Sequence, residues 1–135
     1  MSTVYLLDNN AVAAAVRNPR GPVAFGIRRR GANIVTSVMV ESEIRYGLAK
    51  NPQSNVGHRV RRFVDGMTVL TFGSDAAHHY GEIRDSLESR GETIDALDML
   101  IAAHARSLDA CLVTDNVRRF ERVAGLTWEN WQRRE

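Results

Sequence analysis

Residues 3–17 read TVYLLDNNAVAAAVR, an apolar run that meets an acid and continues into an alanine-rich run. Four of the first five residues are apolar, and the five are rich in branched and aromatic side chains, which favours a buried strand. The alanine-rich part favours a helix that Asn10 caps and that the following Asn-Pro-Arg-Gly-Pro segment must end. The stretch therefore predicts a buried strand that leads, across Asp8, into a helix.

The same alternation of strand and helix continues outward to the end of the chain. Further strands are expected at 33–37, 68–72, 110–114 and, at one edge, 126–128. Helices are expected at 22–30, at 38–50 after a Ser37 cap, around 56–64, and at 74–91, 95–108 and 116–120. Strands separated by helices imply parallel pairing with right-handed crossovers. We therefore expect an α/β fold, a central parallel sheet of four to five strands with helices on both faces, as a single domain over residues 1–135.

The size and composition of the chain fit a protein that folds without cross-links. Of its 135 residues, 44% are hydrophobic, and a chain of this size buries about two-thirds of its unfolded surface. The single cysteine, Cys111 in the apolar run ACLV, excludes a disulfide framework and a Cys-built zinc site. We expect Cys111 to be a buried structural thiol in a reduced, cytoplasmic protein. We expect neither a signal peptide nor a membrane span.

The basic residues are almost all arginine. Net charge is only +2, and Lys50 is the single lysine among 18 basic residues. The arginines cluster at 28–30, 59–62, 118–122 and 133–134. Arginine grips phosphate through two parallel hydrogen bonds, but such clusters are equally common on solvated helix faces. Taken alone, they fit both interpretations about equally well.

Two acids lie directly after predicted strands. Asp8 follows the first strand, and Asp115 follows the strand at 110–114. In an open parallel sheet the working crevice lies outside the carboxyl ends of the strands, so both acids are candidates for chemistry. The structural alternative for each is an N-cap or an Asx turn, which is common where a strand meets a helix.

Two further acids lie on the buried faces of predicted helices. Glu43 falls beside the apolar stripe of its helix, whereas Glu41 lies four residues before Arg45 and fits a solvated ion pair. Asp98 lies three residues before Ile101, on the buried edge of a first helical turn. A buried carboxylate without a partner costs several kcal/mol. Glu43 and Asp98 therefore need a cation, a network of donors or a raised pKa.

The four acids are expected near the same edge of the sheet. Asp8, Glu43, Asp98 and Asp115 would repel one another in one crevice unless a divalent cation neutralised them. Carboxylate oxygens with few imidazoles suit Mg²⁺ or Mn²⁺ rather than zinc, and the four histidines show no metal-binding spacing. This arrangement points to metal-assisted phosphodiester cleavage.

Four separated stretches, YLLDNN, VTSVMVESEIRYG, TIDALDMLIAAHA and LVTDNVRRFERV, resemble in order and spacing the motifs of PIN-domain ribonucleases. They are especially similar to the VapC-type toxins of bacterial type II toxin–antitoxin pairs. The resemblance covers nearly the whole chain and implies a PIN-like fold. It also implies a magnesium-dependent endoribonuclease, with Mn²⁺ as a substitute, that cleaves a structured RNA such as tRNA or ribosomal RNA. The implied partners are a VapB-type antitoxin, a second copy in a homodimer, and operator DNA bound only through the antitoxin.

The family's functional residues carry over by position. Its first acid matches Asp8, its helical Glu before Tyr-Gly matches Glu43, and the acid in its later helix matches Asp98. The residue after its last core strand matches Asp115. In this interpretation the three aspartates hold the metal ion, and Glu43 binds metal or orients the attacking water. The supporting positions are Asn116, Glu121, and Asn9, which replaces the family's usual threonine and can still donate a hydrogen bond.

Other phosphate-handling classes lack their motifs here. The chain has no GxxxxGK[ST] or GxGxxG loop. A phosphate-receiver domain needs a Lys after a late strand, but the only Lys lies in a predicted helix. The remaining alternative is a non-catalytic nucleic-acid or regulatory binding module on the same fold, with the Arg clusters as its binding surface. Divalent-metal dependence of RNA cleavage distinguishes this module from the nuclease.

Overall fold

A five-stranded parallel sheet forms the centre of the computed structural model, which describes residues 2–132. The strands lie in the order β3-β2-β1-β4-β5, and every neighbouring pair is parallel. The strands are β1 Tyr5–Leu7, β2 Ile34–Ser37, β3 Val69–Leu70, β4 Cys111–Val113 and β5 Thr127–Glu129. The predicted parallel sheet is confirmed, and the last strand forms one edge as expected.

The first predicted strand is the middle strand of the sheet. Leu6 of β1 pairs with Val35 of β2 on one side and with Leu112 of β4 on the other. All three side chains are buried. A strand covered on both faces has apolar side chains pointing both ways, which explains the unbroken apolar run before Asp8.

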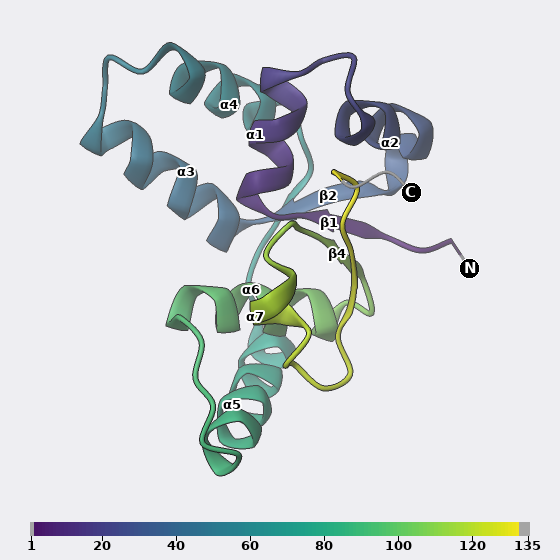
Figure 1. Cartoon of the computed structure of the whole chain (residues 1–135), viewed down its shortest axis with the longest axis vertical. Coiled ribbons are helices and arrows are strands. Elements are labelled where there is room, and N and C mark those ends of the chain that lie inside the picture. Colours follow the sequence, from purple (N-terminus) through teal and green to yellow (C-terminus); the bar gives the residue numbers. More distant parts are fainter. Residues whose placement is uncertain (1, 133–135) are drawn as a thin grey trace.

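Helices cover both faces of the sheet, as predicted (Figure 1). The helices α1 to α4 lie on one side of it, and α5 to α7 lie on the other. The helices are α1 Asn9–Arg17, α2 Pro22–Arg30, α3 Val38–Lys50, α4 Asn55–Asp65, α5 Ser74–Ser89, α6 Ala96–Ser107 and α7 Val117–Phe120, with a 3₁₀ helix at Gly31–Asn33. Gly91, just beyond α5, has a φ of 69°, the left-handed conformation typical of a helix end.

The cap of α1 differs from the prediction. Asp8, not Asn10, is the N-cap, and its Oδ1 accepts a hydrogen bond of 2.8 Å from the backbone N–H of Asn9. The helix begins immediately after the strand, so Asn10 lies within the first turn. Its side chain instead reaches the end of β4, where its Oδ1 accepts a hydrogen bond from the backbone N–H of Asp115 at 2.9 Å.

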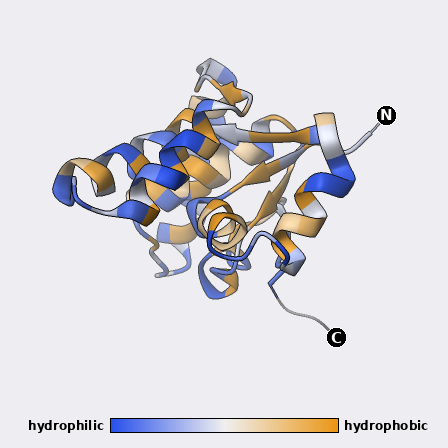
Figure 2. Cartoon of the chain, turned by 90° about the horizontal axis from the view of Figure 1, so that it is seen from above, coloured by the Kyte–Doolittle hydropathy of each residue, from blue (hydrophilic) through white to orange (hydrophobic). Residues whose placement is uncertain are grey.

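One hydrophobic core fills the space between the sheet and its helices. Figure 2 shows hydrophobic residues along the strands in the middle of the molecule and hydrophilic bands on the surrounding helices. Cys111 is 1% exposed, as expected, and burial raises the pKa of its thiol to about 12. The helix expected at 95–108 ends one residue earlier, at Ser107, and Leu108 beyond it is 40% exposed. Between residues 2 and 132, no helix combines the length and the hydrophobicity that a membrane crossing requires.

Candidate active site

Asp8 lies at the carboxyl end of the central strand and is only 3% exposed. Its Oδ2 accepts a hydrogen bond from Thr114 Oγ1 at 2.8 Å and another from Asn10 Nδ2 at 3.1 Å. Its Oδ1 accepts the capping bond from the Asn9 backbone. All of these donors are neutral, so the charge of the carboxylate is hydrogen bonded but not neutralised.

The pKa of Asp8 lies above its ordinary value because the carboxyl is buried. Hydrogen bonds from Thr114, from the Asn9 backbone and from Asn10 lower the pKa, and the nearby charge of Asp98 raises it. The net direction is upward. The positive charge around Asp8 is therefore too small to offset the cost of burying its ionised form.

Asp98 lies in the first turn of α6 and is 6% exposed. Asp95 is the N-cap of this helix, as its side chain accepts a hydrogen bond from the backbone N–H of Leu97 at 3.2 Å. The Oδ2 atom of Asp98 instead lies 2.7 Å from Nη1 of Arg119, in α7. Burial raises the pKa of Asp98, and the Arg119 guanidinium lowers it only in part.

Glu43 comes to the same place from α3 and is half-buried. Burial raises its pKa most, the charges of Asp8 and Asp98 raise it further, and a hydrogen bond with the Asn9 side chain opposes them. Glu41, two residues earlier, forms the expected surface ion pair with Arg45 at 2.8 Å. The ion pair of Glu41 is confirmed, and Glu43 is the glutamate that lies near Asp8 and Asp98, but both glutamates are half-buried rather than one buried and one solvated.

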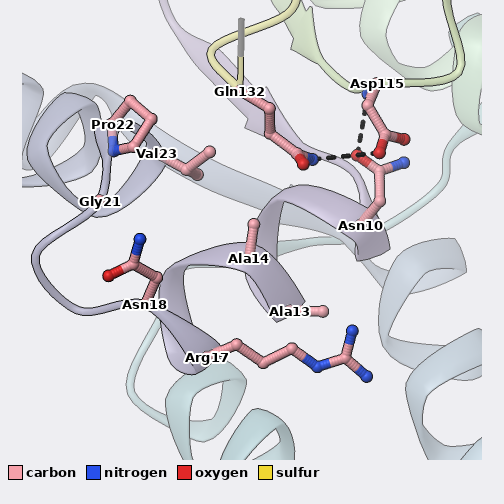
Figure 3. A pocket seen from close by; sticks show the side chains of 10 residues that line it. All are labelled: Asn10, Ala13, Ala14, Arg17, Asn18, Gly21, Pro22, Val23, Asp115 and Gln132. Carbon is pink, nitrogen blue, oxygen red and sulfur yellow. Dashed lines mark hydrogen bonds between the residues drawn. The ribbon is translucent and has the colours of Figure 1, made fainter.

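Asp115 is placed differently from the other three acids. It is exposed, and its Oδ2 accepts a hydrogen bond of 3.1 Å from Gln132 Nε2. With Asn10, Arg17 and Gln132 it lines a cavity of about 400 Å³ between α1, α2 and the end of the chain that the structure describes (Figure 3). By contrast, the charge of Asp98 raises the pKa of Asp8, and the charges of Asp8 and Asp98 raise the pKa of Glu43. The structure thus brings together three of the four predicted acids, with Asp115 beside them.

The three supporting positions, Asn9, Asn116 and Glu121, differ in how closely they contact the acids. The side chain of Asn9 lies close enough to Glu43 to lower the pKa of that carboxyl. Asn116 donates its backbone N–H to Thr114 Oγ1 at 3.1 Å. Glu121 is exposed, and among residues 2–132 its side chain forms no hydrogen bond or ion pair.

Three residues of the site were missed in the sequence. Thr114 is 1% exposed and bonds to Asp8, Asn10 and Asn116 through one oxygen. A hydroxyl at the end of the otherwise apolar run ACLVT was the available signal. Asn10 was assigned to a cap and Arg119 to a surface cluster, and nothing local in the sequence marks their contacts with the acids.

The donor set fits a magnesium ion. Among the residues that the structure describes, no three His, Cys, Asp or Glu side chains converge closely enough to enclose an ion. Mg²⁺ does not need such a cage, because it is usually held by one or two carboxylates and keeps several waters. Asp8 and Asp98 are two buried carboxylates whose charges act on each other, and such a pair suits a hydrated divalent cation.

Known proteins with related sequences share this fold. The family model described as PIN domain matches residues 5–126. Ribonuclease VapC2 from Haemophilus influenzae is 33% identical over 129 residues, which cover 94% of this chain and 97% of that protein. The tRNA(fMet)-specific endonuclease VapC from Shigella flexneri has the same identity and coverage. The structure of VapBC2 from Rickettsia felis, bound to a DNA fragment from its promoter, matches with a TM-score of 0.86 at 30% identity, over 96% of this chain and 99% of that chain.

The family match spans most of the chain, and the relatives align over nearly all of it. Their names also agree with the resemblance carried by the four motifs. This chain therefore belongs to the PIN-domain family, among its VapC-type members.

Proposed function

We propose that this chain is a divalent-metal-dependent endoribonuclease that acts as the toxin of a toxin–antitoxin pair. The observation that supports it best is the meeting of Asp8, Glu43 and Asp98 from β1, α3 and α6, each with a raised pKa. Acids in this state lack the positive charge that a bound divalent cation would bring. The names of the VapC relatives, ribonuclease and tRNA-specific endonuclease, support the same activity.

In this proposal the aspartates bind the metal ion and Glu43 acts on the attacking water. Asp8 and Asp98 hold the metal ion. Asp115, which accepts a hydrogen bond from Gln132 at 3.1 Å, would have to leave that partner to join them. Bound Mg²⁺ would lower the pKa of an attacking water and stabilise negative charge at the scissile phosphate. Glu43 is half-buried with a raised pKa, so it is suited to orient that water and take its proton. Asn9, whose side chain lowers the pKa of Glu43, is proposed to stabilise the ionised form of that carboxyl.

The proposed substrate is a structured RNA, tRNA or ribosomal RNA, cleaved in the cytoplasm. The relative from Shigella flexneri is named for tRNA(fMet). The proposed partners are a VapB-type antitoxin and a second copy of the chain, with operator DNA bound only through the antitoxin. The structure of VapBC2 from Rickettsia felis, bound to promoter DNA, supports the antitoxin and the DNA among these partners.

The decisive experiment is RNA cleavage with and without divalent metal. The purified protein is incubated with total tRNA and ribosomal RNA in Mg²⁺ or Mn²⁺, and then in excess EDTA. We expect cleavage that stops in EDTA and returns when the metal is restored. Cleavage that persists in EDTA would reject the metal-dependent mechanism. RNA binding without cleavage under every metal condition would favour the non-catalytic binding module.

A first prediction concerns Thr114, which donates its hydroxyl to Asp8. Replacing Thr114 with Val should weaken Mn²⁺ binding by about tenfold or more, the usual effect of removing a residue that holds a metal ligand. Thr36→Val is the matched control, because Thr36 is also buried but donates to the Leu7 carbonyl at 2.7 Å. Both variants should lose roughly 1 kcal/mol or more of stability. Calorimetric titration of Mn²⁺ into each provides the comparison, and equal affinities would show that Thr114 has only a structural role.

A second prediction concerns the proposed antitoxin. A carboxylate-lined site should attract an Arg from the tail of the antitoxin. Neighbouring apolar residues of that tail should bind near α1 and α2. Phe25 of α2 is 52% exposed there, and Ala15, Ile27 and Phe63 line a cavity of about 120 Å³ between α1, α2 and α4. We expect a peptide of the cognate tail both to block cleavage and to lower Mn²⁺ affinity, as measured by calorimetry. Unchanged metal affinity would mean that inhibition acts elsewhere.

A further inference from the structure

A cation from the chain itself already lies at the carboxylate site. Arg119, the third residue of α7, places Nη1 2.7 Å from Oδ2 of Asp98. The side chain of Asp98 is 8% exposed and that of Arg119 is 54% exposed, so the ion pair joins a buried acid to a guanidinium at the surface. A guanidinium that remains half in water loses little solvation when such a contact forms or breaks.

The two buried aspartates are stabilised in different ways. Asp8 accepts hydrogen bonds from neutral groups only, whereas Asp98 accepts one from a charged group. Within residues 2–132, Arg119 is the only basic residue that forms an ion pair with Asp8, Glu43 or Asp98. Its guanidinium contacts Asp98, whose charge raises the pKa of Asp8. Arg119 therefore supplies part of the countercharge that the site requires.

We propose that Arg119 is a displaceable countercharge: it occupies Asp98 while metal is absent, and a divalent cation must break this ion pair before it can bind Asp98. This inference rests on the proposed function, because it concerns the metal site of that nuclease. The guanidinium donates to one of the two carboxylate oxygens that a metal ion would use, so the two cations compete for the same group. Arg119 thereby raises the metal concentration at which the site fills.

The test compares Mn²⁺ binding to the wild type, Arg119→Gln, Arg119→Lys and Arg118→Gln by calorimetry. Arg118 is the matched control, since it is the preceding residue of α7, is exposed, and forms no side-chain hydrogen bond or ion pair within residues 2–132. Each substitution to Gln removes one positive charge from the same helix, but only Arg119→Gln removes the ion-pair partner of Asp98. Thermal melts without metal establish that each variant is folded.

We expect Arg119→Gln to bind Mn²⁺ more tightly than Arg118→Gln, by up to about fivefold, the factor expected when a competing ion pair of about 1 kcal/mol is lost. The Mn²⁺ concentration needed to raise its melting temperature should fall accordingly. Arg119→Lys keeps the charge and should stay close to the wild type. If Arg119→Gln does not fold, Arg119→Met takes its place in the same comparison with Arg118→Gln, because it also removes the charge and keeps an unbranched side chain.

Three outcomes separate the inference from the proposed function. If Arg119→Gln binds Mn²⁺ as tightly as Arg118→Gln or more weakly, the proposed competition is wrong. Arg119 would then have no effect on metal binding or would assist it. Saturable Mn²⁺ binding that is lost in Asp8→Asn still supports the metal site in that case. Absence of Mn²⁺ binding in the wild type itself overturns both.

Discussion

Replacing Asp8 with Asn is expected to reduce RNA cleavage by more than about 100-fold while the protein remains folded. Loss of a residue that merely supports a metal ligand costs about 10- to 100-fold, and Asp8 is the proposed ligand itself. The substitution keeps the size of the side chain, and Asn caps helices about as well as Asp. Initial rates of cleavage at saturating Mg²⁺, with circular dichroism to confirm the fold, provide the measurement. A variant that retains cleavage close to that of the wild type would remove Asp8 from the mechanism.

The same variant should change how stability depends on pH. Because the pKa of Asp8 is raised in the folded protein, its protonated form is favoured by folding. That contribution is fully present below the ordinary pKa of 3.8 and is lost as the pH rises through the raised value. Asn has no such titration. The melting temperature of Asp8→Asn relative to the wild type, both without metal, should therefore increase from about pH 4 to about pH 7. A difference that does not change with pH would contradict the raised pKa.

Replacing Glu43 with Gln should lower cleavage by about 100-fold or more, the usual contribution of a general base. The same change at Glu41 should leave cleavage nearly unaltered. Glu41 lies on the outer side of α3, and Arg45 keeps a second partner in Asp65 at 3.1 Å when Glu41 is neutralised. An exposed ion pair of this kind contributes less than about 1 kcal/mol to stability.

The two glutamate variants are compared at equal concentrations of RNA and metal. Both changes remove one negative charge from α3, so a general electrostatic effect on RNA binding would act on both alike. Equal losses of cleavage in Glu41→Gln and Glu43→Gln would show that the face of the helix turned toward Asp8 does not matter. A loss confined to Glu43 would support its role beside the metal.

Local sequence was sufficient for the sheet and for three of the acids. Strand β1 is covered on both faces, so its apolar run is continuous and stops at Asp8. The helical period separates Glu43 from Glu41, because two steps of about 100° each place their side chains on nearly opposite sides of the helix. Asp98 follows from the same period in α6. These features depend on neighbours a few residues apart, so the sequence displays them directly.

The surroundings of each acid were decided only by the tertiary structure. Thr114 reaches Asp8 across 106 residues of sequence, and Arg119 reaches Asp98 across 21. Asp115 follows a strand just as Asp8 does, but its carboxylate accepts a hydrogen bond from Gln132 and lines the cavity between α1 and α2. The sequence by itself determined which acids reach the edge of the sheet, because strand ends and helix faces follow from local pattern. Which groups meet those acids depends on how distant segments pack, and no local pattern specifies that.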